Sequence, residues 1–225
     1  MLATVLTTLT AACVCAQATE YGTWGDSMFS GGAIGSPISN MQYNNATNWS
    51  NLNGKVDTVQ GDVVVSGAAG GNLMDITTMN NTFVNSNQFV GPQGSIGSKI
   101  DVGINNVGGS VGIQNQVVCN GLGVSTDPAW SATQSVQTCN ASDPSSEIHA
   151  RVSNVYGDAI FAGSAMSNSF EADSNAPNMP VFNSQINNST VASTVNAKVF
   201  NLGGSTSLSS SAIGNTGQII HYNMD

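Results

Sequence analysis

The sequence predicts an all-β protein, built as a β-solenoid-like stack of short strands in two tandem repeat modules. Apolar and polar residues alternate along short runs such as VQGDVVVSG (residues 59–67), the period of a strand. Apolar residues do not recur at helical spacing over any useful length. The phrase VQGDVVVSG also returns as VYGDAIFAG at residues 155–163, 96 positions later, which indicates a duplicated strand.

A second pair of phrases extends the repeat. TTMNNTF (77–83) matches SAMSNSF (164–170) at a separation of 87 residues, so the first copy carries a short insertion. Units this small cannot bury their own apolar face and must stack on one another. A β-sandwich with long loops remains an alternative. The repeat-defining residues are Gly61, Asp62, Gly67, Met79, Asn81 and Phe83 in the first copy, and Gly157, Asp158, Gly163, Met166, Asn168 and Phe170 in the second.

Composition, a cleavage signal and chain-breaking dipeptides divide the chain into five segments. Residues 1–18 are apolar and small and end in AQA, which predicts a secretory leader, although no cation precedes Lys55. Two Asp-Pro dipeptides mark a break between the repeats. The predicted segments are a leader (1–18), a Gly/Ser/Asn-rich arm (19–55), a first β-repeat module (56–124), a linker or disulfide loop (125–147) and a second β-repeat module (148–225).

Charge excludes two classes of partner. The formal net charge is -9 and only 8% of residues are charged. The four cations, Lys55, Lys99, Arg151 and Lys198, are too few and too scattered to neutralise a phosphate backbone. We therefore expect no nucleic-acid partner, and an anionic membrane surface is disfavoured for the same reason. No stretch after the leader is apolar over the ~18 residues that a membrane helix needs.

Residues able to support catalysis or to bind a cofactor are scarce in the sequence. Only His149 and His221 could act as near-neutral bases, and there is no Gly-rich phosphate loop. The single GGNLMDI phrase (70–76) fits a tight turn better than a calcium repeat, which needs adjacent copies. We therefore expect no enzyme, no cofactor and no metal site. After removal of the leader the chain keeps two cysteines, and an even pair in an exported protein makes Cys119 and Cys139 a candidate disulfide.

Carbohydrate is a plausible ligand class for such a surface. Asn, Ser and Thr supply hydrogen bonds, and aromatic rings supply faces on which sugars stack. The alternative is that the aromatic residues pack inside the modules or the arm. The candidate glycan contacts are Tyr21, Trp24, Tyr43, Trp49 and Trp130.

The phrases VQGDVVVSG, VYGDAIFAG, SAMSNSF and SAIGNTGQI, behind a leader, resemble the holdfast attachment (holdfast-anchoring) proteins of stalked bacteria, particularly the D-type member. The resemblance implies an exported, outer-membrane-associated protein at the bacterial cell surface, without catalytic residues. It would anchor an adhesive polysaccharide, together with companion anchor proteins, in a homo- or hetero-oligomer. Curli-like functional amyloids and β-repeat adhesins share this phrasing, so a fibre subunit is the alternative. A polysaccharide-active β-helix enzyme is less favoured, because it needs clustered acids on one face.

Overall fold

The computed structural model describes residues 36–126, 131–176 and 178–222. Among them it contains strands and no helix. The strands are β1 (Ser36–Asn44), β2 (Thr47–Val59), β3 (Val63–Thr78), β4 (Thr82–Val90), β5 (Ser95–Val107), β6 (Val111–Thr126), β7 (Ser131–Cys139), β8 (Ser142–Val155), β9 (Ala159–Ser174), β10 (Val181–Asn187), β11 (Ala192–Leu202) and β12 (Thr206–His221).

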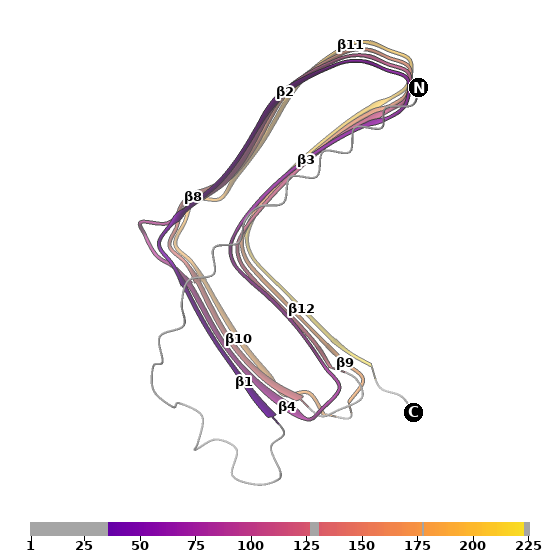
Figure 1. The fold of residues 1–225 in the computed structure, drawn as a ribbon. Coiled ribbons are helices and arrows are strands. Elements are labelled where there is room, and N and C mark those ends of the chain that lie inside the picture. Colours follow the sequence, from indigo (N-terminus) through magenta and orange to yellow (C-terminus); the bar gives the residue numbers. More distant parts are fainter. Residues whose placement is uncertain (1–35, 127–130, 177, 223–225) are drawn as a thin grey trace.

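Every third strand belongs to the same sheet, and all pairings between neighbours are parallel. The three sheets have the orders β1-β4-β7-β10, β11-β8-β5-β2 and β12-β9-β6-β3. Three consecutive strands therefore make one coil, and four coils stack upon one another (Figure 1). The coils span residues 36–78, 82–126, 131–174 and 181–221. This is a β-solenoid, and the predicted all-β stack is confirmed; parallel pairing excludes the β-sandwich alternative.

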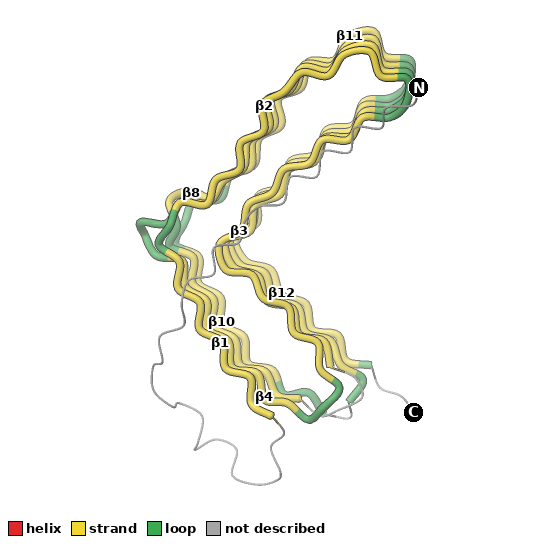
Figure 2. The backbone as a smooth tube through the Cα atoms, viewed as in Figure 1, coloured by secondary structure: helices red, strands yellow, loops and turns green. Residues whose placement is uncertain are grey.

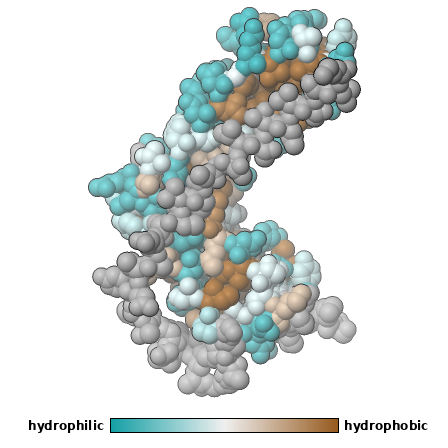
Figure 3. All heavy atoms as spheres, viewed as in Figure 1, coloured by the Kyte–Doolittle hydropathy of each residue, from teal (hydrophilic) through white to brown (hydrophobic). Residues whose placement is uncertain are grey.

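Each coil is bent into two arms rather than wound into a closed triangle. Figure 2 shows that β3 and β12 turn sharply near their middle. One half of each faces the sheet that contains β2 (the β2 series), and the other half faces the sheet that contains β1 (the β1 series). We call the first the apolar arm (β2, β5, β8 and β11 against the first halves of β3, β6, β9 and β12). We call the second the amide arm (β1, β4, β7 and β10 against the second halves of those strands). Hydrophobic residues gather inside both arms, and hydrophilic residues cover the outside (Figure 3).

The bend lies where two consecutive residues of a strand both point inward. In β6 the pair is Cys119 and Asn120, both fully buried, and in β9 it is Ser167 and Asn168. Two inward residues in a row interrupt the alternation of a strand and shift it by one position, as in a β-bulge. In β3 the pair is Gly71 and Asn72, and glycine is needed at position 71 because a Cβ there would collide with the carbonyl oxygen of Cys119 in the next coil.

The repeating unit of the structure is one coil of about 48 residues, not the 96 residues that separate the two Gly-Asp phrases. Register partners such as Val63, Val111 and Ala159 follow one another at this spacing. Residues 59–67 and 155–163 therefore lie two coils apart in one uninterrupted stack. The expected linker (125–147) contributes β7 and the start of β8, and residues 36–55 of the expected arm form β1 and most of β2.

The second phrase pair does not mark equivalent positions. Met79 lies in the turn between β3 and β4, whereas Met166 lies within β9 and is aligned with Val118 of β6. Phe83 is in β4 and is only half-buried, but Phe170 of β9 is buried in the core. A separation of 87 residues is not a whole number of coils, so this part of the predicted repeat is wrong. Asn81 and Asn168 likewise differ in position: Asn81 precedes β4, and Asn168 lies inside the bend.

No helix among the described residues combines the length and the apolar character that crossing a membrane requires.

Candidate functional site

The Gly-Asp phrases form the turn between the β2 and β3 series, at the tip of the apolar arm. The carboxylate of Asp62 accepts a hydrogen bond from the backbone N–H of Ser110 in the next coil (2.7 Å). The hydroxyl of Ser110 accepts one from the N–H of Asp158 (3.2 Å), and the carboxylate of Asp158 accepts one from the N–H of Ser205 (2.7 Å). The column therefore alternates Asp, Ser, Asp, Ser.

This alternation explains why the phrase returns after two coils. Strands of neighbouring coils are about 4.8 Å apart, so Asp in every coil would place carboxylates directly against one another. Ser110 and Ser205 separate the acidic residues and still complete the chain of hydrogen bonds. The glycine before each serine is required, because a Cβ on Gly109 or on Gly204 would collide with the aspartate oxygen of the coil before it.

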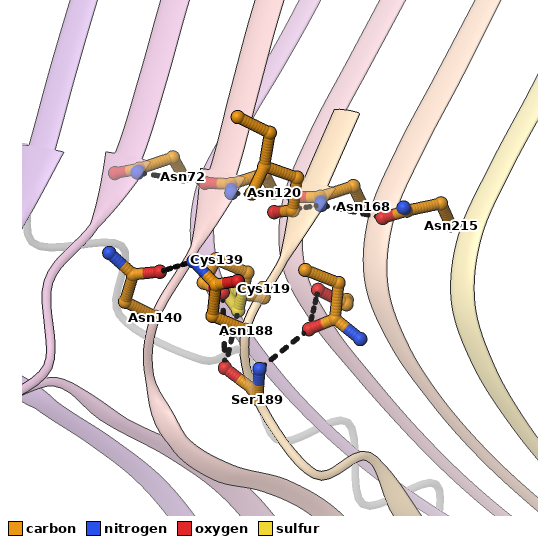
Figure 4. Close-up of a disulfide and its surroundings, with 12 residues drawn as sticks. Asn72, Cys119, Asn120, Cys139, Asn140, Asn168, Asn188, Ser189 and Asn215 are labelled. Atoms are coloured by element: carbon orange, nitrogen blue, oxygen red, sulfur yellow. Dashed lines mark hydrogen bonds between the residues drawn. A yellow bond between two sulfur atoms is a disulfide. The ribbon is translucent and has the colours of Figure 1, made fainter. Parts of the chain in front are cut away.

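A row of asparagines runs through the bend along all four coils, and its members are buried in the first three coils and exposed in the last (Figure 4). Asn72 donates from Nδ2 to Oδ1 of Asn120 (2.9 Å), Asn120 donates to Asn168 (2.8 Å), and Asn168 donates to Asn215 (2.7 Å). We call this row the Asn ladder. Each amide donates toward the C-terminal end of the stack. The second N–H of Asn168 donates to the carbonyl of Ile186, which fixes the amide nitrogen on that side.

A second row, the Gln ladder, holds the amide arm together and points the other way. Gln185 donates from Nε2 to Oε1 of Gln137 (2.9 Å), Gln137 to Gln88 (2.8 Å), and Gln88 to Gln42 (2.7 Å). Each donates toward the N-terminal end of the stack. Each glutamine also donates to a backbone carbonyl of the facing sheet, such as Ser169 for Gln137 (2.8 Å). The Gln ladder therefore joins neighbouring coils and also joins the two faces of the arm.

Cys119 and Cys139 form a disulfide with a Cα–Cα distance of 6.2 Å. Both are fully buried at the bend, in a small core with Val90, Ile96 and Val117. Cys119 is in the second coil and Cys139 in the third, so the bond covalently links two coils (Figure 4).

Two of the aromatic residues expected to contact glycans lie on the outer surface, on either side of the turn between β1 and β2. Tyr43 is 50% exposed and Trp49 is 47% exposed. The Tyr43 ring stacks on Phe89 of the next coil, with centroids 5.2 Å apart and an interplanar angle of 9°. The Trp49 ring covers Gly97, where a Cβ would collide with it. We call Tyr43, Trp49 and Phe89 the aromatic corner.

The other expected glycan contacts, Tyr21, Trp24 and Trp130, lie outside the described residues. The sequence did not single out Phe89, whose role becomes visible only through the pairing of β1 with β4. It also missed Tyr156, which is 80% exposed and borders a cavity of about 780 Å³ at the tip of the apolar arm. Its place within the phrase VYGDAIFAG, at the residue before a stacked turn, was the available signal.

Charged side chains are dispersed over the surface. Glu147 and His149 approach to 3.9 Å on the outer face of β8, and both are partly exposed. Within the described part of the chain no three His, Cys, Asp or Glu side chains come together as metal ligands would.

Comparison with known proteins identifies the family. The chain matches the family described as holdfast attachment protein D over residues 26–224. No curated protein and no solved structure matches it. Because the match covers nearly the whole chain, the protein belongs to the holdfast attachment protein D family.

Proposed function

We propose that this chain is an exported, non-enzymatic protein of the bacterial outer surface that anchors an adhesive polysaccharide, the holdfast, to the cell envelope with companion anchor proteins. Family membership supplies the attachment role. The observation that carries the polysaccharide contact is the aromatic corner, where three rings lie on the outer face of a rigid stack.

The chemistry of the aromatic corner suits a sugar. Pyranose rings present C–H faces that pack on exposed aromatic rings, while their hydroxyls need hydrogen-bonding groups nearby. Asn45 lies beside the corner and donates from Nδ2 to the hydroxyl of Tyr43 (2.8 Å), which orients that hydroxyl. Because Tyr43 and Trp49 are held by β-strands rather than by a long loop, little conformational entropy is lost when a ligand binds.

The test is to replace the gene in its host with a Tyr43→Ala, Trp49→Ala double variant. Surface-grown cells are rinsed and the adhesive is stained with a labelled lectin. If the aromatic corner holds the polysaccharide, cells wash away and stained adhesive stays on the surface. The matched control is Ile160→Ala, which removes an exposed apolar side chain (48% exposed) from the outer face of β9, in a middle coil, and these cells should stay attached. An immunoblot of surface-exposed protein should show equal amounts of both variants.

Cells of the double variant that remain attached through their adhesive would contradict the proposed contact. Loss of attachment by Ile160→Ala as well would show that the rings have no specific role.

The alternative is a fibre subunit related to functional amyloids and β-repeat adhesins. The specific observation in its favour is the pair of amide ladders, since stacked Asn and Gln side chains are a feature of cross-β fibres. The two functions are compatible, because a protein that joins with copies of itself can also hold a polysaccharide.

A further inference from the structure

The two end coils have open strand edges and apolar side chains that are less buried than those of the middle coils. Within the described residues, β1, β2 and β3 are edge strands at one end of the stack, and β10, β11 and β12 are edge strands at the other. Inward-facing residues of the middle coils, such as Ile100 and Ile148, are fully buried. Their counterparts in the end coils are only partly buried: Leu52, Val56, Val59, Val195, Val199 and Leu202. A row of apolar side chains beside an open strand edge is a template for one more coil.

The Asn ladder leaves complementary atoms at the two ends. Its amides donate toward the C-terminal end, so Asn215 presents Nδ2 there, supported by a 3.3 Å hydrogen bond to the carbonyl of Gln185. At the N-terminal end Asn72 presents Oδ1, and no described residue donates to it. An amide nitrogen that still has a hydrogen to donate therefore lies at one end, and an acceptor lies at the other.

The Gln ladder also leaves a donor at one end of the stack and an acceptor at the other, but at the opposite ends from those of the Asn ladder. At the C-terminal end Gln185 presents Oε1, because its Nε2 donates to Gln137 and to the carbonyl of Thr216. At the N-terminal end Gln42 presents Nε2, which donates to the carbonyl of Leu73 (3.3 Å) and has a second hydrogen available. A second copy placed on the C-terminal end in the same orientation would continue both ladders.

The alternating column of aspartate and serine at the tip of the apolar arm would also continue into a second copy. The last coil ends on Ser205 and the first begins on Asp62, so a second copy extends the alternation without placing two carboxylates in contact. Strand lengths also agree: β12 and β3 both have 16 residues, and β11 and β2 have 11 and 13.

Surface charge is compatible with the same arrangement. Phe200 and Asp57 occupy the same column of register partners, so Phe200 of the last coil would lie next to Asp57 of the following copy. The like-charge contact it creates is Lys198 over Lys55, and the stack already contains such a pair, Arg151 beside Lys198. Exposed pairs of this kind contribute little to stability.

We propose that copies of this chain stack head to tail, with β10, β11 and β12 of one copy pairing in parallel with β1, β2 and β3 of the next. Contact between two identical ends would set Asn215 donors against each other and reverse the strand direction. A head-to-tail contact does not close, so it generates an open series of oligomers. The proposal rests on the end coils and needs no polysaccharide.

Sedimentation of the purified full chain, without polysaccharide and over a wide range of concentration, tests the proposal. We expect dimers, trimers and longer species in an open series. Asn215→Asp keeps the acceptor that Asn168 uses but replaces the outward donor by a charge facing Asn72 of the next copy. This variant should fold normally and associate at least about tenfold more weakly.

The matched control is Gln185→Glu, which adds the same charge to the same coil. Its outward atom stays an acceptor for Gln42 of the next copy, while its bond to Gln137 is lost. It should therefore unfold more easily than the unmodified chain but keep the open series of oligomers. A monomer at every concentration, a series that stops at dimers, or equal association of Asn215→Asp and the unmodified chain would each overturn the proposal.

Discussion

The two arms of each coil have the same backbone but are held together differently. The apolar arm is filled by aliphatic columns in which Ile100 lies against Ile148, and Ile104 against Val152. In the amide arm fully buried polar residues lie beside an apolar cluster that includes Val84 and Phe170, and Gln88 is bonded to Gln137. Aliphatic contacts have no direction, whereas an amide ladder has a donor end and an acceptor end. Both arms therefore bury apolar side chains, and the amide ladders of the amide arm and the bend add register and polarity.

The largest effect is expected from Gln137→Glu, which breaks the amide arm from within. The side chain keeps its size but loses the hydrogen bonds to Gln88 and to the carbonyl of Ser169, and it places a carboxylate against two acceptors. Removing a partner from a buried polar network in this way costs about 4 kcal/mol. Chemical denaturation followed by circular dichroism measures the change. A loss below about 1 kcal/mol would mean that the Gln ladder does not hold the arm together.

A somewhat smaller effect is expected from Ile148→Ala in the apolar arm. Ile148 is fully buried between Ile100 and Val195, so the truncation leaves a cavity and should lower the free energy of unfolding by about 3 kcal/mol. Ile148→Val in the same denaturation assay should cost about 1 kcal/mol. Equal losses from both substitutions would argue against tight packing at this site.

The smallest effect is expected at the exposed turn, from Ser110→Asp. This substitution inserts a third carboxylate in register between those of Asp62 and Asp158, and like charges directly opposite one another are destabilising by up to about 1 kcal/mol. The melting temperature should fall at low ionic strength and recover at high ionic strength, because salt screens exposed charges. Ser110→Asn has a similar shape without the charge, and its melting temperature should not depend on salt in this way.

The sequence revealed the strand period and the stacked architecture because alternation depends on local residues alone. It did not reveal the 48-residue coil, since serine replaces aspartate at Ser110 and Ser205 and identity returns only in alternate coils. Stacked asparagines could be expected in such a coil, but the residues that form the amide ladders were not identified, for a different reason. Gln42 and Gln88 are 46 residues apart, Gln88 and Gln137 are 49 apart, and glutamines and asparagines are common elsewhere in the chain.

Surface features were harder still to predict. Tyr43 and Trp49 were identified by residue type, but their common position beside one turn follows from the winding of β1 into β2. The stacking of Tyr43 on Phe89 depends on a strand pairing between coils, which no local pattern in the sequence reports.

The register between coils is the central claim, and paired cysteines test it most directly. In a Cys13→Ser, Cys15→Ser background, Gln114→Cys with Ala162→Cys introduces two outward residues that are register partners in β6 and β9. Their Cα atoms lie about 4.8 Å apart, within the reach of a disulfide.

The control joins Gln114→Cys with Ser164→Cys, one outward position further along β9 and roughly 8 Å away, which is too far for a disulfide. Peptide mapping by mass spectrometry should find an intramolecular disulfide in the first variant and free thiols in the second. A disulfide in the second variant alone, in both variants equally, or in neither would contradict the four-coil register.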